Sequence, residues 1–192
     1  MKKKYWIILL LIIIIAISII FLKKGFKNHK FGNNESSQEI VNDLLELSSY
    51  KMQITVNITS NKNSNKYILK QTYQEPNIST QEVIEPSNIA GVKIENDGTN
   101  LKIENSNLNL STILENYKYL GDNSLDLITF INEYKQNEKS RFEETETEIK
   151  LFTSTKILYV DKKTKKPIKM EIKDNNQKTT VYILYNEVEI NS

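Results

Sequence analysis

The sequence predicts a mainly β domain of the α+β class that follows a single transmembrane helix. Three observations support this prediction. Residues 5–22 form an apolar stretch long enough to cross a bilayer, most of the chain after residue 50 alternates between apolar and polar positions, and two short stretches repeat apolar residues at helical spacing. Turn signals separate the alternating runs, so each predicted strand pairs with its neighbour along the chain.

The apolar stretch, residues 5–22, contains no charge and no proline. As a helix it reaches roughly 27 Å, close to the thickness of a bilayer core. Three lysines precede it, no small-x-small cleavage pattern follows it, and the chain has no cysteine that could be acylated. We therefore predict an uncleaved signal anchor, with a cleaved signal peptide as the alternative.

The predicted organisation has four parts and places the large domain outside the cytoplasm, in the cell envelope. Four lysines just after the span favour the opposite orientation by the positive-inside rule, so charge alone does not support this side. The parts are a basic N-terminus (1–4), the anchor (5–22), a juxtamembrane linker (23–36) and an extracytoplasmic β domain (37–192).

Charge and composition exclude several classes of function. The chain has 26 Lys+Arg and 24 Asp+Glu, and seven of the lysines flank the anchor, so the β domain is acidic and unlike a nucleic-acid binder. Without cysteine, and with His29 in the linker as the single histidine, thiol chemistry, His-based triads and common metal sites are ruled out. Glu144, Glu146 and Glu148 would share one face of a strand, the pattern of a solvated face. We predict no catalytic residue, no cofactor and no metal.

The elements follow from local signals. A helix over 38–47 has Ser36 or Ser37 as its N-cap, and a second helix over 124–136 has Ser124 in that role. Asp97-Gly98 predicts a tight hairpin within 91–105, and residues 110–120 are expected to hold one short turn. The other predicted strands are 50–60, 66–76, 78–84, 142–146, 149–154, 156–160, 168–172 and 179–190.

The turn at 161–167, "DKKTKKP", carries four lysines and is interpreted as the hydrated tip of a hairpin. A second interpretation, contact with anionic lipid headgroups or wall polymers, stays open because the domain is tethered beside a membrane.

Two stretches carry a resemblance to a known family. Residues 158–190, "LYVDKKTKKPIKMEIKDNNQKTTVYILYNEVEI", and residues 72–109, from "TYQEP" to "NSNLN", resemble strands of the LolA-like lipoprotein-carrier superfamily. The resemblance to the superfamily runs over about 38–190, and within the superfamily the chain resembles clostridial germination lipoproteins of the GerS type. It departs from that pattern because it lacks the lipidated cysteine, Trp6 lies in the anchor and Arg141 is the single arginine.

The resemblance implies a strongly curved antiparallel sheet, an incomplete barrel, covered by two or three helices. It implies a non-enzymatic binding protein that holds lipid, lipoprotein acyl chains or a hydrophobic partner segment; the alternative is a scaffold that docks a spore-cortex amidase during sporulation or germination. An open space under the sheet would favour lipid, and a filled interior with an exposed sheet edge would favour docking. The candidate lining residues, which ordinary core packing would also explain, are Ile54, Val56, Ile58, Tyr67, Leu69, Tyr73, Ile94, Leu101, Ile103, Phe130, Ile131 and Tyr134.

Overall fold

The computed structural model describes residues 36–60, 63–116 and 125–191. They belong to one compact unit, Ser36–Ser192. The predicted anchor, residues 5–22, and His29 lie outside the described residues. Within the described ranges, no helix is long and apolar enough to span a membrane.

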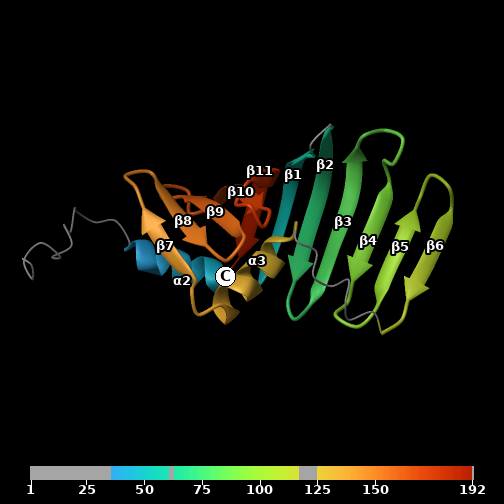
Figure 1. Ribbon diagram of the computed structural model, residues 1–192. Coiled ribbons are helices and arrows are strands. Elements are labelled where there is room, and N and C mark those ends of the chain that lie inside the picture. The colour runs from blue at the N-terminus through green and yellow to red at the C-terminus, as the bar shows by residue number, and fades with distance from the viewer. Residues whose placement is uncertain (1–35, 61–62, 117–124, 192) are drawn as a thin grey trace, which may run out of the picture. The chain divides into compact units, whose positions relative to one another are not determined.

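An antiparallel sheet of eleven strands dominates this unit (Figure 1). The first six strands form a meander in which each pairs with the next, and the last five form a second meander. The strands are β1 (Ser49–Thr59), β2 (Ser64–Gln74), β3 (Ile78–Glu85), β4 (Val92–Asn96), β5 (Leu101–Asn105), β6 (Leu110–Leu114), β7 (Arg141–Glu144), β8 (Glu148–Phe152), β9 (Lys156–Asp161), β10 (Pro167–Lys173) and β11 (Thr179–Asn191).

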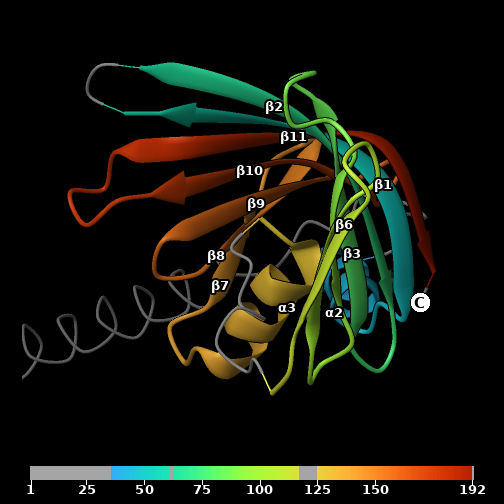
Figure 2. The same cartoon turned by 90° about the vertical axis from the view of Figure 1, so that its right-hand side faces the viewer.

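Pairing of β1 with β11 joins the two meanders in the middle of the sheet. The sheet does not close into a barrel, so β6 and β7 are its two edge strands. It curves around the helix α3 (Leu127–Gln136), which lies on its concave side (Figure 2). This arrangement agrees with the predicted curved, incomplete barrel.

The hairpin between β4 and β5 shows how the turns are specified locally. Gly98 has a φ of +87°, which glycine adopts without strain. The Asp97 carboxylate accepts hydrogen bonds from the backbone N–H groups of Thr99 and Asn100 at 2.8 and 2.6 Å. The hairpin predicted from Asp97-Gly98 is therefore confirmed.

The first described helix, α2 (Ser37–Leu45), begins with a capping box. The Glu39 N–H donates to the Ser36 hydroxyl, and the Glu39 carboxylate accepts from the Ser36 N–H at 2.7 Å. The prediction of a serine cap is confirmed here. It is wrong for α3, whose N-cap is Asp126, two residues beyond the expected Ser124.

The core lies between the helices and the concave face of the sheet. Tyr50, Met52, Ile54 and Val56 of β1 point into it, while Lys51 between them is exposed. The buried residues of α2, α3, β1, β2 and β8 to β11 form one hydrophobic cluster. At about 25 cal/mol per Å² of apolar surface removed from water, this burial supplies the main driving force for folding.

Two features of the local structure differ from what the sequence predicted. Residues 110–114 form strand β6, which was not predicted, because Leu110 to Leu114 pair in register with β5; the turn expected within 110–120 follows the strand at 115–116. Glu144 and Glu148 do not share a strand: β7 ends at Glu144, and Thr145 closes a turn in which its hydroxyl accepts from the Glu148 N–H at 3.1 Å.

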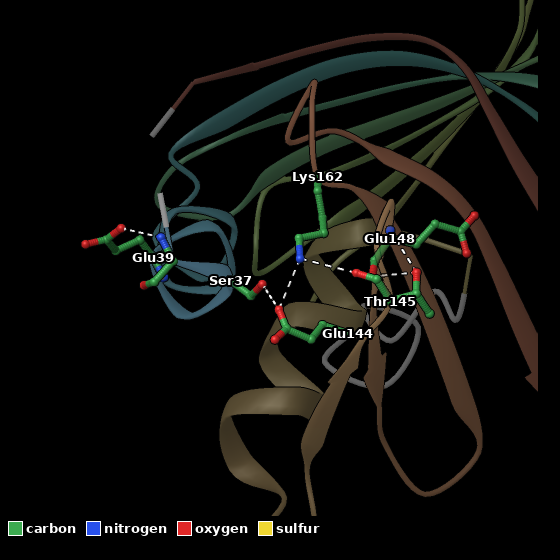
Figure 3. Close-up of polar contacts among 7 residues, drawn as sticks. Ser37, Glu39, Glu144, Thr145, Glu148 and Lys162 are labelled. Atoms are coloured by element: carbon green, nitrogen blue, oxygen red, sulfur yellow. Dashed lines mark hydrogen bonds and ion pairs between the residues drawn. The ribbon is translucent and has the colours of Figure 1, made fainter. Parts of the chain in front are cut away.

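The 161–167 turn contacts other elements instead of serving only as a hydrated tip. Lys162 Nζ lies 3.1 Å from a Glu144 carboxylate oxygen, which also accepts a hydrogen bond from the Ser37 hydroxyl (Figure 3). Lys166 Nζ donates to the Val188 carbonyl at 2.6 Å. The turn thus links α2, β7 and β11.

Candidate partner-binding surface

The predicted lining residues fall into two groups. Most belong to the packed core: six are buried in the hydrophobic cluster and three are partly buried against it. Leu101 is buried outside that cluster, and Ile94 and Ile103 are half-buried on β4 and β5. The core members are Ile54, Val56, Leu69, Tyr73, Phe130 and Ile131, with Ile58, Tyr67 and Tyr134 against them.

Side chains fill the space between α3 and the middle of the sheet. Ile54, Val56, Phe130 and Ile131 each have 0% of their surface exposed. Such enclosure is typical of close-packed interiors, in which few voids exceed the size of a water molecule. These side chains therefore act as core in the structure.

Strands β4 and β5 have one charged face and one apolar face, and uncharged β6 continues the apolar one. On the outer face, Lys93 pairs with Glu95 at 3.2 Å and Lys102 pairs with Glu104. The register places the opposite set of residues on the concave side, because Ile94 lies opposite Gln81 of β3, which contacts α3's N-cap. We call this set the inner apolar patch: Val92, Ile94, Leu101, Ile103, Leu110 and Leu114.

The inner apolar patch ends at β6, where apolar side chains are exposed. Leu110 and Ile113 have exposed fractions of 62% and 58%, and Leu108 in the preceding turn is 64% exposed. The strand, "LSTIL", has no charge. In the part of the chain that the structure describes, no strand pairs with its outer edge.

The opposite edge is built differently. Strand β7 has only four residues and carries Arg141, Glu143 and Glu144. Arg141 Nε lies 3.4 Å from Glu143, and Glu144 is held by Ser37 and Lys162. Short length and charged side chains are the usual means by which an edge strand avoids pairing with other chains. Strand β7 has both features, whereas β6 carries no charged side chain.

Polar groups lie beside the inner apolar patch on the β3 side, where α3 begins. Asp126 is 4% exposed, and its carboxylate accepts a hydrogen bond from Gln81 Nε2 at 2.5 Å. Gln71 Nε2 donates to the Leu125 carbonyl at 3.3 Å. Burial raises the pKa of Asp126 to about 7, although the hydrogen bond from Gln81 opposes that shift.

A depression of about 300 Å³ lies on the other face of the sheet, near the ends of β1, β2 and β11. Its lining is largely polar and includes Lys51, Thr72, Gln74 and Glu189, with Ile78 as an apolar wall. This volume is at the lower limit of small-molecule sites, and the lining differs from the apolar walls that such sites usually have. None of the predicted lining residues except Tyr73 contributes to it.

The described residues offer little for catalysis. Within these ranges, no three His, Cys, Asp or Glu residues lie close enough together to hold a metal ion. Asp126 is the one buried carboxylate among the described acidic residues, and it faces hydrophobic core and amides without a second acid beside it. A pair of carboxylates for acid–base work is therefore lacking at this position.

Comparison with known proteins supports the fold. The sequence matches no protein-family model and no curated protein. The structure is similar to an uncharacterised conserved protein from Thermus thermophilus, with a TM-score of 0.53 and 12% identity over 82% of this chain and 88% of that one. The two chains share a fold.

Two further similarities have TM-scores below 0.5. One is with a chain of the complex between the CwlD amidase and the GerS lipoprotein of Clostridioides difficile, at a TM-score of 0.47 and 24% identity over 83% of this chain and 98% of that one. The other is with a LolA superfamily protein from Nitrosomonas europaea, at a TM-score of 0.41 and 12% identity over 82% of this chain and 94% of that one.

Sequence reasoning missed the large apolar side chains that are most exposed among the described residues. Leu108, Leu110 and Ile113 were not among the predicted site residues, because no strand was predicted between residue 105 and the second helix. The usable signal was composition: residues 106–114 contain no charge in a domain where charged residues are frequent.

Proposed function

We propose that this chain is a non-enzymatic docking protein whose β6 edge binds an extended segment of a partner protein. The observation that carries the proposal is the uncharged β6 edge, where Leu110 of the inner apolar patch and Ile113 on the outer face are exposed. A strand added there would find unpaired backbone groups for hydrogen bonding and apolar side chains on both faces.

The alternation along β6 suits this mode of binding. Leu110, Thr112 and Leu114 lie on the concave side, where Thr112 is paired with Ile103 of β5. Ile113 lies on the outer side. A partner strand with apolar residues at alternate positions would therefore extend the inner apolar patch and cover Ile113 as well.

Lipid binding is the weaker candidate. An acyl chain needs an apolar space of several hundred Å³. The positions expected to line it, such as Ile54 and Phe130, are fully enclosed by other side chains. The exposed edge and the filled interior together favour docking.

The partner class that we propose is a cell-envelope amidase, which the sequence resemblance to GerS-type germination lipoproteins implies. Residues 5–22 would tether the docking unit to the membrane, with the unit on the outer side. A complex between a CwlD amidase and a GerS lipoprotein is known from Clostridioides difficile.

Binding of the full-length chain in detergent micelles to a CwlD-type amidase of the same organism tests the proposal. The double variant Leu110→Lys/Ile113→Lys should weaken binding by roughly tenfold or more, because it adds charge to the edge. The matched control is Leu184→Lys, an exposed apolar residue (37%) on the central strand β11. Failure of the wild type to bind, or equal loss in the control, would contradict the proposal.

A further inference from the structure

The β6 edge has a sequence that can pair with a second copy of itself. The strand reads "LSTIL", with Leu110 and Leu114 placed symmetrically on either side of Thr112. These three residues lie on the concave side, and Ser111 and Ile113 lie on the outer side. Two such strands, antiparallel about a two-fold axis at Thr112, bring the same surface of both chains into contact.

In this register the concave faces of the two copies continue into each other. Leu110 of each copy lies directly opposite Leu114 of the other, and the two Thr112 side chains meet at the axis. Apolar cross-strand pairs and Thr–Thr pairs both stabilise antiparallel strands. Because Thr112 is paired with Ile103 of β5, the inner apolar patches of both chains join across the axis.

Charges on the outer face favour the same register. Lys102 of β5 lies opposite Ile113, and Glu104 lies opposite Ser111. With the axis at Thr112, Ile113 of one copy lies opposite Ser111 of the other. Each row across the junction therefore begins at Lys102 of one chain and ends at Glu104 of the other. These ends are three strand spacings apart, roughly 14 Å at the backbone, so their attraction selects the register more than it adds stability.

Other antiparallel registers are less favourable. An axis at Ile113 places Lys102 of both copies at the ends of one row, and an axis at Ser111 does the same with Glu104. Each of these registers sets like charges toward each other and leaves two of the five strand residues without a partner in the opposing strand. An axis between two residues sets Leu110 of the concave side against Ile113 of the outer side, which joins unlike faces.

The opposite edge of the sheet is a poorer partner for β6. Strand β7 carries Arg141, Glu143 and Glu144, and Glu144 is already bound to Ser37 and Lys162. Pairing of β6 with β7 of another copy would also leave a free edge at each end, so that further copies could add without limit. Pairing of β6 with β6 closes at two copies.

We propose that two copies of this chain pair through their β6 edges, antiparallel about Thr112, and that a partner strand must displace one copy to bind. The self-pairing does not depend on the proposed function, whereas the competition rests on it. Five residues from each chain make a small contact, which is typical of weak and reversible association. The uncharged edge is thereby covered until the partner arrives.

Oxidative cross-linking of the full-length chain in detergent micelles tests the pairing. The chain has no cysteine, so one introduced cysteine reports on one position. Directly opposite residues of an antiparallel pair have Cα atoms about 4.5–5.5 Å apart, within the range of a disulfide. Thr112 is exposed in the single chain, so its replacement leaves the core intact. Thr112→Cys should form at least fivefold more disulfide-linked dimer than Ser111→Cys or Ile113→Cys alone, whose positions lie diagonally across the axis from themselves.

Two controls fix the register. In an equimolar mixture of Ser111→Cys and Ile113→Cys chains with tags of different length, the mixed dimer should exceed either same-variant dimer at least fivefold, because these positions face each other when the axis lies at Thr112. Glu143→Cys on β7 measures chance collision. Cross-linking of Thr112→Cys no greater than that of Glu143→Cys, or a mixture without excess mixed dimer, would overturn the self-pairing.

Amidase binding separates this inference from the docking proposal. The oxidised Thr112→Cys dimer should bind a CwlD-type amidase of the same organism at least tenfold more weakly than the same chain after reduction, because both of its edges are occupied. Cross-linking at Thr112 without amidase binding would keep the self-pairing and reject the partner, and binding without cross-linking would do the reverse. Equal binding by the oxidised and reduced chains would overturn the competition.

Discussion

At the scale of single residues, buried polar side chains have the largest consequences. Asp126 replaces what could have been an apolar contact at the base of α3, and Lys156 is a buried ammonium held by Glu133. Each position gives the helix a defined orientation on the sheet at a cost in desolvation. The stability of the domain should therefore depend on pH through Asp126.

We expect the free energy of unfolding to decrease as pH rises from about 4 to 7. The pKa of Asp126 is raised from 3.8 to about 7 in the folded state, so in this window the folded chain binds a proton that the unfolded chain has released. The loss at neutral pH is up to about 4 kcal/mol, at 1.36 kcal/mol per pKa unit. Denaturant unfolding at several pH values measures it.

The variant Asp126→Asn isolates this contribution. Its stability should vary less between pH 4 and 7 than that of the wild type, because asparagine keeps a hydrogen bond to Gln81 without ionising. An unchanged slope would mean that other groups control the pH dependence.

At the scale of elements, the 161–167 turn serves as a clip. Lys162 contacts Glu144 and the Thr145 carbonyl, and Glu144 also binds Ser37 at the start of α2 (Figure 3). These contacts lower the pKa of Glu144, with the Ser37 hydrogen bond as the larger cause. Their stabilisation is present at neutral pH and is lost as pH falls through the lowered pKa.

Replacing Lys162 with methionine should reduce the free energy of unfolding by about 0.5–1 kcal/mol, the range of a partly exposed ion pair with a hydrogen bond. Lys163→Met, at an exposed position of the same turn, is the matched control and should change stability by less than about 0.5 kcal/mol. Equal effects of the two substitutions would mean that Lys162 makes no stabilising contact and that the turn is only a solvated hairpin tip.

At the scale of the whole molecule, two meanders meet at a single long-range junction. Each strand pairs with its sequence neighbour, except where β1 pairs with β11. That junction runs from Ser49 opposite Asn191 to Ile58 opposite Val181. It makes one sheet of both meanders and leaves β6 at an open edge.

The orientation of the chain in the membrane remains a prediction from residues 5–22. Protease added to intact protoplasts should digest the β domain, because the anchor is expected to place it outside. The cytoplasmic side would be assigned instead if the domain were fully protected until the membrane is permeabilised.

The sequence alone determined the features that depend on neighbouring residues. The serine N-cap of α2, the Asp97-Gly98 hairpin and the alternation of β1 each involve groups a few positions apart. Such interactions form in almost any fold that contains the segment, and so the strands and helices were largely predictable.

Only the tertiary structure decided which faces meet and which stay open. Ile54 and Ile103 both alternate with polar neighbours, yet Ile54 is enclosed by α3 and Ile103 is half-exposed on β5. The residues 110–114 became a strand through pairing with β5, and the Asp126 side chain, at the N-cap of α3, accepts a hydrogen bond from Gln81 of β3 and makes no capping hydrogen bond to its own helix. These outcomes depend on partners distant in the chain, because burial and strand pairing are set by where the whole sheet places each segment.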